Sequence, residues 1–256
     1  MRTLVKLILT LAVGAAGLVV AVVALAPAAR AMFTAGSSGG TTDVLKLAEL
    51  PETSNVYDDQ GNLIATFHAD QNRVPVTFSQ VPSSVVAAVV DTEDAKFWVH
   101  HGVNVWATAR ALFSNGKNGG VLQGGSTITQ QLVKNTLLTD QRTLTRKLKE
   151  AVLAIRLESK LSKQQIMERY LNTVYLGNGA YGIGAAAQVY FDEPVEKLTP
   201  AQGALLAGLI QDPSGYDPIQ HPDLARSRRS FVLNEMVAHG DMTRATASLD
   251  KLAPIP

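Results

Sequence analysis

The sequence contains no cysteine. This absence excludes thiol catalysis, disulfide bonds and cysteine metal sites, and it fits an exported protein. A large excess of one charge is also lacking, because the formal net charge is +1, but a sum over the whole chain hides local asymmetry. Of the 256 residues, 46% are hydrophobic, which is enough for the core of one or two domains.

The N-terminal residues differ in kind from the rest. Arg2 and Lys6 precede an apolar run over residues 7–29, and a membrane span needs roughly 20 apolar residues. A cleaved signal peptide is the alternative, because residues 29–31 (Ala-Arg-Ala) resemble a cleavage site. The apolar part of a signal peptide is usually only ~7–15 residues long, so the run favours a retained anchor. The basic N-terminus predicts that it is cytoplasmic and that the remainder lies outside the membrane.

The remaining chain is expected to form a tether and one soluble domain. Residues 33–42 (FTAGSSGGTT) are small and polar, which is typical of a flexible linker. Alternating apolar residues over 55–67 predict a short β-hairpin. From Pro82 onward the periodicity is helical. We therefore predict a mainly α protein with an N-terminal transmembrane helix and a short β-hairpin, divided into an anchor over 1–32, a linker over 33–50 and a folded domain over 51–250.

Two helix starts carry capping-box signatures. Ser162 is followed three residues later by Gln165, and Thr199 is followed by Pro200 and then Gln202. A hydroxyl side chain at the N-cap and a glutamine at the third helical position satisfy two otherwise unpaired backbone N–H groups. We expect helices to begin after Ser162 and after Thr199.

A first chemical motif covers residues 92–102 (TEDAKFWVHHG). Glu93 ends an apolar helical pattern, beside Asp94 and before two aromatic residues. A carboxyl group at the edge of an apolar wall tends to have a raised pKa, which suits a general base. The plainer alternative is a helix-terminal acid pair next to aromatic core residues. The adjacent His100 and His101 have no spacing that indicates a metal site.

A second motif covers residues 124–135 (GGSTITQQLVKN). Two glycines and hydroxyl residues at a helix start can direct backbone N–H groups at a phosphate. The Walker A spacing is absent, and Ser126 alone can be read as an ordinary N-cap. Residues 114–117 fit the S-x-x-K pattern of penicillin-recognising enzymes but lack its S-D-N and K-T-G partners, so we interpret them as a loop.

Residues 134–169 are rich in basic residues, because nine of them are Lys or Arg and only four are Asp or Glu. A solvated helix face is the ordinary explanation of such a pattern. Within this segment Lys147 and Glu150 are three residues apart on a predicted helix, so they can line one cleft or pair with each other.

Five segments occur in order: EDAKFWVHHG, GGSTITQQLVKN, RKLKE, QQIMERYLNTVYLG and ARSRRSFVLNEM. Together they resemble the five motif regions of the peptidoglycan glycosyltransferase family, glycosyltransferase family 51. That family comprises monofunctional glycosyltransferases and the N-terminal domains of class A penicillin-binding proteins. The resemblance covers roughly residues 57–240. It implies a lysozyme-like helical lobe with a smaller lobe next to the membrane.

The resemblance also implies a reaction. Glu93 matches the catalytic glutamate, which takes a proton from the 4-hydroxyl of the acceptor N-acetylglucosamine. That hydroxyl attacks the donor N-acetylmuramic acid, so lipid II is polymerised into β-1,4-linked glycan and undecaprenyl pyrophosphate leaves. Glu150 matches a second carboxylate, with an orienting or an acid–base role. The resemblance implies three cations that bind the donor pyrophosphate: Lys134, Arg142 and Lys147. It also implies three cleft residues: Ser126, Gln130 and Gln131.

Further implications concern cofactors, partners and location. The resemblance implies a divalent cation, Mg or Mn, at the pyrophosphate, with no protein metal site and no organic cofactor. It implies lipid II, the growing glycan strand, the membrane and other cell-wall synthesis proteins as partners, and no nucleic acid. The protein is expected to be single-pass in a bacterial cytoplasmic membrane, with its catalytic domain outside. Asn172, Tyr175, Arg228 and Arg229 match the last two motifs and are interpreted as architectural.

Two rival functions stay open. A lytic transglycosylase shares the lysozyme-like architecture but cleaves glycan, and the cations Lys134, Arg142 and Lys147 argue against it. An inactive, membrane-tethered wall-binding scaffold is the other rival, and the presence of both Glu93 and Glu150 argues against it. The sequence leaves open whether this is a stand-alone glycosyltransferase or the front part of a class A penicillin-binding protein.

Overall fold

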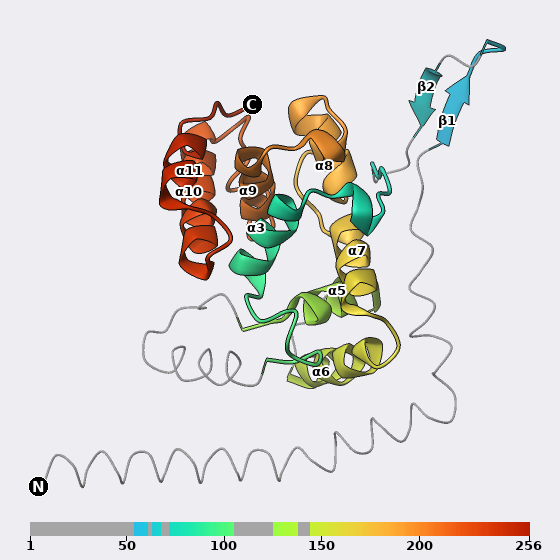
Figure 1. Cartoon of the computed structure of the whole chain (residues 1–256). Helices are drawn as coiled ribbons and strands as arrows, with labels where there is room; N and C mark the ends of the chain where they lie inside the picture. The colour runs from blue at the N-terminus through green and yellow to red at the C-terminus, as the bar shows by residue number, and fades with distance from the viewer. Residues whose placement is uncertain (1–53, 61–62, 68–71, 105–124, 138–143) are drawn as a thin grey trace, which may run out of the picture.

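The computed structural model describes residues 54–60, 63–67, 72–104, 125–137 and 144–256 (Figure 1). Over these residues the protein is mainly helical, which confirms the expected fold class at that level. The predicted anchor over 1–32 and linker over 33–50 lie outside the described residues. Within the described ranges, none of the helices has the length and apolar character needed to cross a membrane.

Two short strands precede the helices. Strand β1 (Ser54–Tyr57) pairs antiparallel with β2 (Leu63–Phe67), with Ser54 opposite Phe67. Figure 1 shows the pair beside the helical body rather than within it. Residues 61–62, between the two strands, lie outside the described residues.

Eight α-helices and two short 3-10 helices follow among the described residues. Their bounds are η1 Phe78–Gln80, α3 Ser83–Glu93, α5 Ile128–Leu137, α6 Leu144–Glu158, α7 Lys163–Thr173, α8 Ile183–Phe191, η2 Val195–Lys197, α9 Pro200–Leu209, α10 Pro222–His239 and α11 Arg244–Asp250. Helices α3, α9 and α10 pack against one another, and α5 packs against α6 and α7. In Figure 1 the group of α3, α9 and α10 lies above the group of α5, α6 and α7, and α3 and α5 face each other across the boundary.

Both predicted capping boxes are present. At the start of α7, the Ser162 hydroxyl accepts from the Gln165 backbone N–H, and the Ser162 N–H donates to the Gln165 side chain at 2.9 Å. Thr199 and Gln202 make the same reciprocal pair at the start of α9. Local sequence therefore set these two helix starts, because each cap satisfies donors that the helix itself cannot.

Helix α9 forms the centre of the upper group. Eight of its ten residues are buried, as expected for a helix that is apolar on all sides. Gly203 permits its close packing on α3, because a Cβ at this position would lie 2.8 Å from the Cγ2 atom of Val85. This contact fixes the axis of α3, whose last residue is Glu93.

Candidate active site

Glu93 is held by a chain of hydrogen bonds that crosses three helices. Its Oε2 atom accepts from Gln131 Nε2 of α5 at 2.8 Å. The Oε1 atom of Gln131 in turn accepts from the Tyr170 hydroxyl of α7 at 2.9 Å. Tyr170 is fully buried. Because an ionised carboxylate can only accept, the amide nitrogen of Gln131 must face Glu93, and Tyr170 keeps it in that orientation.

The surroundings of Glu93 raise the pKa of its carboxyl group. Burial is the largest cause, and the charge of Asp94 acts in the same direction. The hydrogen bond from Gln131 and the charge of Arg228 act against it. Glu93 therefore holds a proton more tightly than a solvated glutamate does, which is the property of a general base working near neutral pH. This agrees with the direction expected from the sequence.

Arg228 belongs to this site although the sequence indicated an architectural role for it. Its guanidinium lies over the Phe231 ring at 4.7 Å and over the Tyr216 ring at 5.6 Å. Burial lowers the pKa of Arg228, and Glu93 is the foremost charge that raises it again. The two side chains are thus electrostatically coupled, and Arg228 favours the ionised form of Glu93. Its motif was visible in the sequence, but this proximity was not.

The start of α5 is bound to the end of α3 by Asp94. The Asp94 Oδ2 atom accepts from the Ile128 backbone N–H at 3.1 Å and is 2.7 Å from His100 Nε2. The N-cap of α5 is Thr127, whose hydroxyl accepts from the Gln130 N–H at 3.1 Å and donates to the Gly102 carbonyl at 2.7 Å. Asp94 therefore joins the loop after α3 to the first turn of α5.

This arrangement excludes the alternative of Ser126 as the N-cap and corrects one expectation for the second motif. Thr127, not Ser126, caps the helix, and Gln130 is buried and completes a capping box by accepting from the Thr127 N–H at 2.9 Å. Protein groups thus already bind the N–H groups of Thr127, Ile128 and Gln130. These N–H groups are not directed at a phosphate, because a carboxylate and two capping side chains satisfy them first.

A second cluster joins Ser126 to helix α6. Lys147 Nζ lies 2.7 Å from Ser126 Oγ and 2.7 Å from Glu150 Oε2. Arg146 Nε is 3.1 Å from the other carboxylate oxygen of Glu150. Glu150 is buried, whereas the Lys147 side chain is 45% exposed. Lys147 therefore pairs with Glu150 and also presents its charge to solvent beside Ser126.

Of the two other predicted cations, the structure describes Lys134 but not Arg142. Lys134 is exposed in the last turn of α5, three residues after Gln131 and so on the same side of that helix. Arg142 lies outside the described residues. The structure thus brings Glu93 together with Gln131, and Ser126 together with Lys147 and Glu150. Gln131 is on α5 and Ser126 lies two residues before its start, so α5, which packs on α6 and α7, connects the two sets.

His100 is part of a buried network that the sequence did not reveal. Besides Asp94, its ring lies 3.8 Å from Glu158, which binds Lys163 at 2.8 Å and the Thr129 hydroxyl. Within the described ranges, no group of three or more His, Asp or Glu side chains could hold a metal ion. The network ties α5, α6 and α7 to the loop that follows Glu93.

The chain matches the model of the family described as Transglycosylase over residues 60–237. It is 49% identical to penicillin-binding protein 1A of Aquifex aeolicus over 193 residues, which are 75% of this chain and 26% of that protein. It is 45% identical to penicillin-binding protein 1A of Escherichia coli over 200 residues, 78% of this chain and 23% of that protein. A crystal structure of penicillin-binding protein 1A from Haemophilus influenzae aligns with 81% of this chain and 21% of its own, at 24% identity and a TM-score of 0.48.

The chain belongs to the transglycosylase family, because the family match covers more than half of its residues. The resemblance to peptidoglycan glycosyltransferases that the five motifs indicated is confirmed. The chain spans about a quarter of the length of the curated relatives it matches.

Proposed function

We propose that this chain polymerises lipid II, joining lipid-linked disaccharides into β-1,4-linked glycan for the bacterial cell wall. The observation that carries the proposal is the Glu93 site: a carboxyl group with a raised pKa, held in place by Gln131 and Tyr170. The family and the ordered motifs support the same reaction. Glu93 acts as the general base in this proposal.

The reaction is a displacement at the anomeric carbon of the donor N-acetylmuramic acid. Glu93 takes the proton of the acceptor 4-hydroxyl, whose oxygen forms the new bond to that carbon. The bond from the same carbon to the pyrophosphate oxygen breaks, and undecaprenyl pyrophosphate departs with the electron pair. Attack from the opposite face inverts the configuration to β.

Two exposed lysine side chains can stabilise the negative charge of the pyrophosphate leaving group. Lys134 and Lys147 have side chains open to solvent, so both can contact a pyrophosphate. Negative charge grows on the pyrophosphate as its bond to the sugar breaks, so fixed cations stabilise the transition state more than the ground state. A glycan-cleaving enzyme has no such leaving group and protonates a sugar oxygen instead. Arg142 stays a prediction of the motif.

Glu150 is assigned an orienting role. It is 1% exposed and bound by Arg146 and Lys147, one on each carboxylate oxygen. A buried carboxylate engaged by two cations fixes both cations in position. We therefore place Glu150 behind Lys147, holding the lysine toward Ser126 and the donor.

A divalent cation at the pyrophosphate would be held mainly by the phosphate oxygens. Within the described residues, no three His, Asp or Glu side chains form a metal site of their own, and both carboxylate oxygens of Glu150 are paired with cations. The steps proposed above use only the side chains of the chain. Mg or Mn at the pyrophosphate remains a prediction from the resemblance.

The remaining assignments follow from the sequence. The apolar run over 7–29 is proposed as the anchor in the bacterial cytoplasmic membrane, with the catalytic domain outside and the β1–β2 pair in a small lobe near the bilayer. An anchored enzyme is suited to a substrate whose lipid tail stays in the membrane. The growing glycan strand and other cell-wall synthesis proteins are the proposed partners.

Polymerisation of purified lipid II by the detergent-solubilised full chain tests the proposal. Glu93→Gln is expected to reduce the rate by ~10²–10⁴-fold, while Glu196→Gln, at an exposed site in η2, leaves it unchanged. Solubilisation of purified peptidoglycan is measured in parallel. Robust cleavage without polymer would favour the lytic rival. A folded wild-type protein with neither activity would favour the scaffold.

A further inference from the structure

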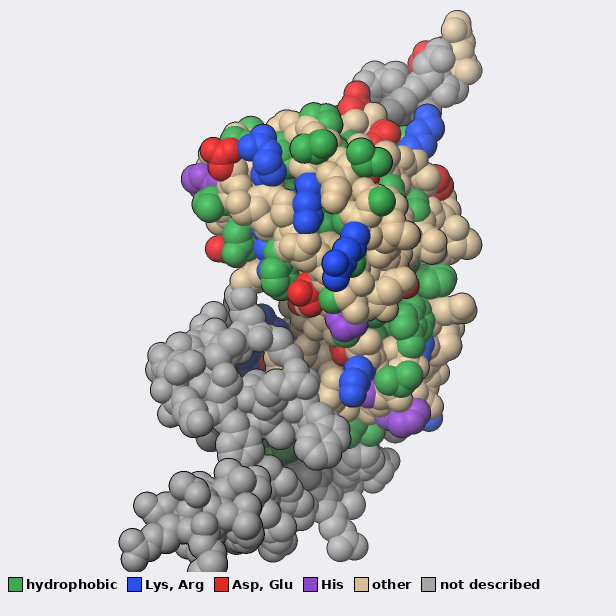
Figure 2. Space-filling view, turned by 60° about the vertical axis from the view of Figure 1, so that its left-hand side comes forward, with side chains coloured by type: hydrophobic (Ala, Val, Ile, Leu, Met, Phe, Trp, Pro, Cys, Tyr) green, Lys and Arg blue, Asp and Glu red, His purple; other side chains and the backbone are tan. Residues whose placement is uncertain are grey.

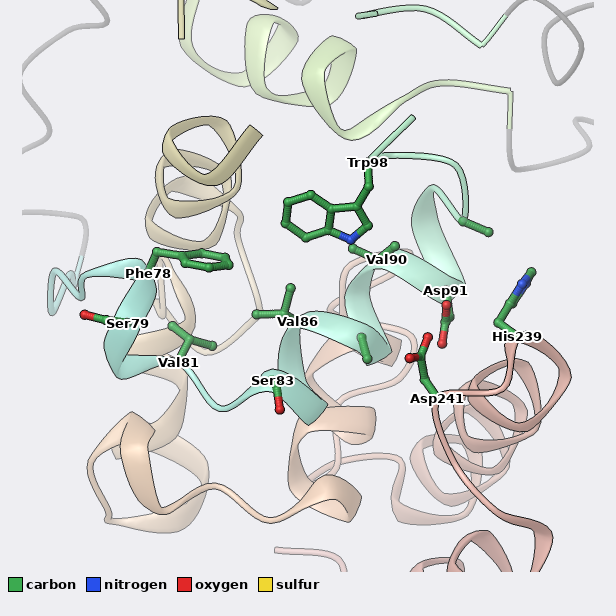
Figure 3. A pocket seen from close by; sticks show the side chains of 12 residues that line it. Phe78, Ser79, Val81, Ser83, Val86, Val90, Asp91, Trp98, His239 and Asp241 are labelled. Carbon is green, nitrogen blue, oxygen red and sulfur yellow. The ribbon is translucent and has the colours of Figure 1, made fainter. Parts of the chain in front are cut away.

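A groove of about 550 Å³ lies between α3, η1 and the C-terminal end of α10 (Figure 3). Its walls are mostly apolar, with Phe78 from η1, Val86 from α3 and Trp98 from the loop after α3. The Trp98 side chain is 45% exposed, and its ring meets the Phe78 ring edge-on with centroids 6.4 Å apart. We call this feature the α3–α10 groove.

The groove is separate from the candidate active site. Asp91 lines it and precedes Glu93 by two residues on α3. Each residue of an α-helix advances by about 100°, so side chains two positions apart point to nearly opposite faces. Neither Glu93 nor Gln131 lines the groove. Occupation of the groove is therefore compatible with a substrate at Glu93.

Two carboxyl groups close one end of the groove. Asp91 from α3 and Asp241 from the turn after α10 point toward each other, with His239 beside them (Figure 3). Asp91 is only 6% exposed. The protonated acid hydrogen-bonds to Asp241, whereas the Oδ2 atom of the ionised carboxylate has no donor among the described residues. A buried acceptor without a donor is costly in free energy, so a ligand that donates a hydrogen bond there is favoured.

We propose that the α3–α10 groove binds a lysine side chain, flanked by apolar residues, of a partner polypeptide. An ammonium group has three donors and no acceptor, so it can satisfy Asp91 Oδ2 and also bind Asp241. The methylene stem and the flanking residues would lie along Val86 and Trp98. No lysine or arginine among the described residues lines the groove and fills this role already.

Other occupants suit the groove less well. A metal ion is disfavoured because the described residues offer no cluster of three ligating side chains. A bilayer surface is disfavoured because the apolar surface is concave and ends in two acids, which an anionic membrane repels. Cationic and acidic side chains are interspersed on the face seen in Figure 2. Selection of a cationic partner therefore depends on the Asp91–Asp241 pair rather than on an extended negative region of the surface.

The same pair makes binding dependent on pH. Burial is the largest cause that raises the pKa of Asp91 to about 7, followed by the charge of Asp241, the hydrogen bond to the Asp241 side chain and the charge of Glu235. An ammonium binds the ionised pair best, so affinity should rise as the pH passes through about 7. His239 lies beside the pair and also lines the groove. Helices η1 and α9, which also border this region, carry no titratable side chain.

Matched peptides test the proposal. The full chain in detergent is titrated with a capped Leu-Lys-Leu tripeptide and with the same peptide carrying norleucine in place of lysine. Binding is followed by NMR at the Trp98 indole, with Trp98→Phe to assign the signal. The lysine peptide should shift this signal, and the norleucine peptide should bind roughly tenfold more weakly or not at all.

Variants complete the test. Asp91→Asn and Asp241→Asn should each weaken binding of the lysine peptide roughly tenfold and abolish its pH dependence, while Asp223→Asn, at an exposed site on α10, should not. Asp241 is exposed, so its variant remains informative if Asp91→Asn fails to fold. Equal binding of both peptides, or binding that ignores both variants, would overturn the proposal. An Asp91-dependent shift with phosphatidylethanolamine bicelles but not with the lysine peptide would assign the groove to lipid instead.

Discussion

The Nε2 atom of Gln131 lies 2.8 Å from Glu93 Oε2, and this amide is itself held by the buried hydroxyl of Tyr170. The proposed base, Glu93 on α3, is therefore positioned by side chains of two other helices, α5 and α7. Three helices must keep their relative positions for the carboxylate to face the substrate.

Tyr170→Phe should lower kcat for lipid II polymerisation by roughly tenfold with little change in KM. The variant keeps the ring in the core but removes the donor that orients Gln131, so Glu93 loses its fixed position rather than its chemistry. Steady-state kinetics checks this. Tyr190→Phe, which removes another buried hydroxyl away from Glu93, serves as the control. An equal loss in both variants would point to general destabilisation.

Arg228→Gln should move the acidic limb of the kcat/KM pH profile to higher pH. Arg228 stabilises ionised Glu93, so removing its charge raises the pKa of Glu93 further, and a higher pH is needed to deprotonate the base. Arg228→Lys should keep most of the wild-type profile. A lower activity with an unmoved limb would show that Arg228 acts only through packing.

Lys134→Ala and Lys147→Ala should each reduce polymerisation, chiefly through kcat. A charge-assisted contact to phosphate contributes ~1.5–3 kcal/mol, and it strengthens as the leaving group gains charge. Lys149→Ala is the matched control, because this exposed lysine on α6 has no role in either cluster. Peptidoglycan cleavage that is indifferent to both substitutions would argue for a hydrolytic enzyme.

Asp91→Asn should flatten the pH dependence of stability. The folded-state pKa of Asp91, about 7, lies above its ordinary value of 3.8, so its contribution is present below pH 4 and lost as the pH rises through about 7. Asparagine mimics the protonated acid and does not ionise. The variant should match wild type below about pH 4 and exceed it at pH 8 by about 1–3 kcal/mol, as measured by denaturant unfolding. A parallel loss of stability at both pH values would contradict this account.

The sequence by itself determined the features that depend on neighbouring residues. The capping boxes at Ser162 and Thr199, the helical periodicity after Pro82 and the end of that helix at Glu93 are all local patterns, and each was placed correctly. The family followed from the order of five such motifs. Short-range hydrogen bonds and side-chain periodicity are written directly into consecutive residues.

Only the tertiary structure decided which distant side chains meet. Glu93 is hydrogen-bonded to Gln131 and electrostatically coupled to Arg228, and Asp91 meets Asp241. These residues come from separate parts of the chain, whose approach depends on packing such as that of Gly203 on Val85. The same applies to the start of α5. Either Ser126 or Thr127 could cap it by sequence, and Thr127 does so because its hydroxyl also reaches the Gly102 carbonyl while Ser126 binds Lys147. Such choices rest on competing long-range hydrogen bonds, which a linear pattern does not record.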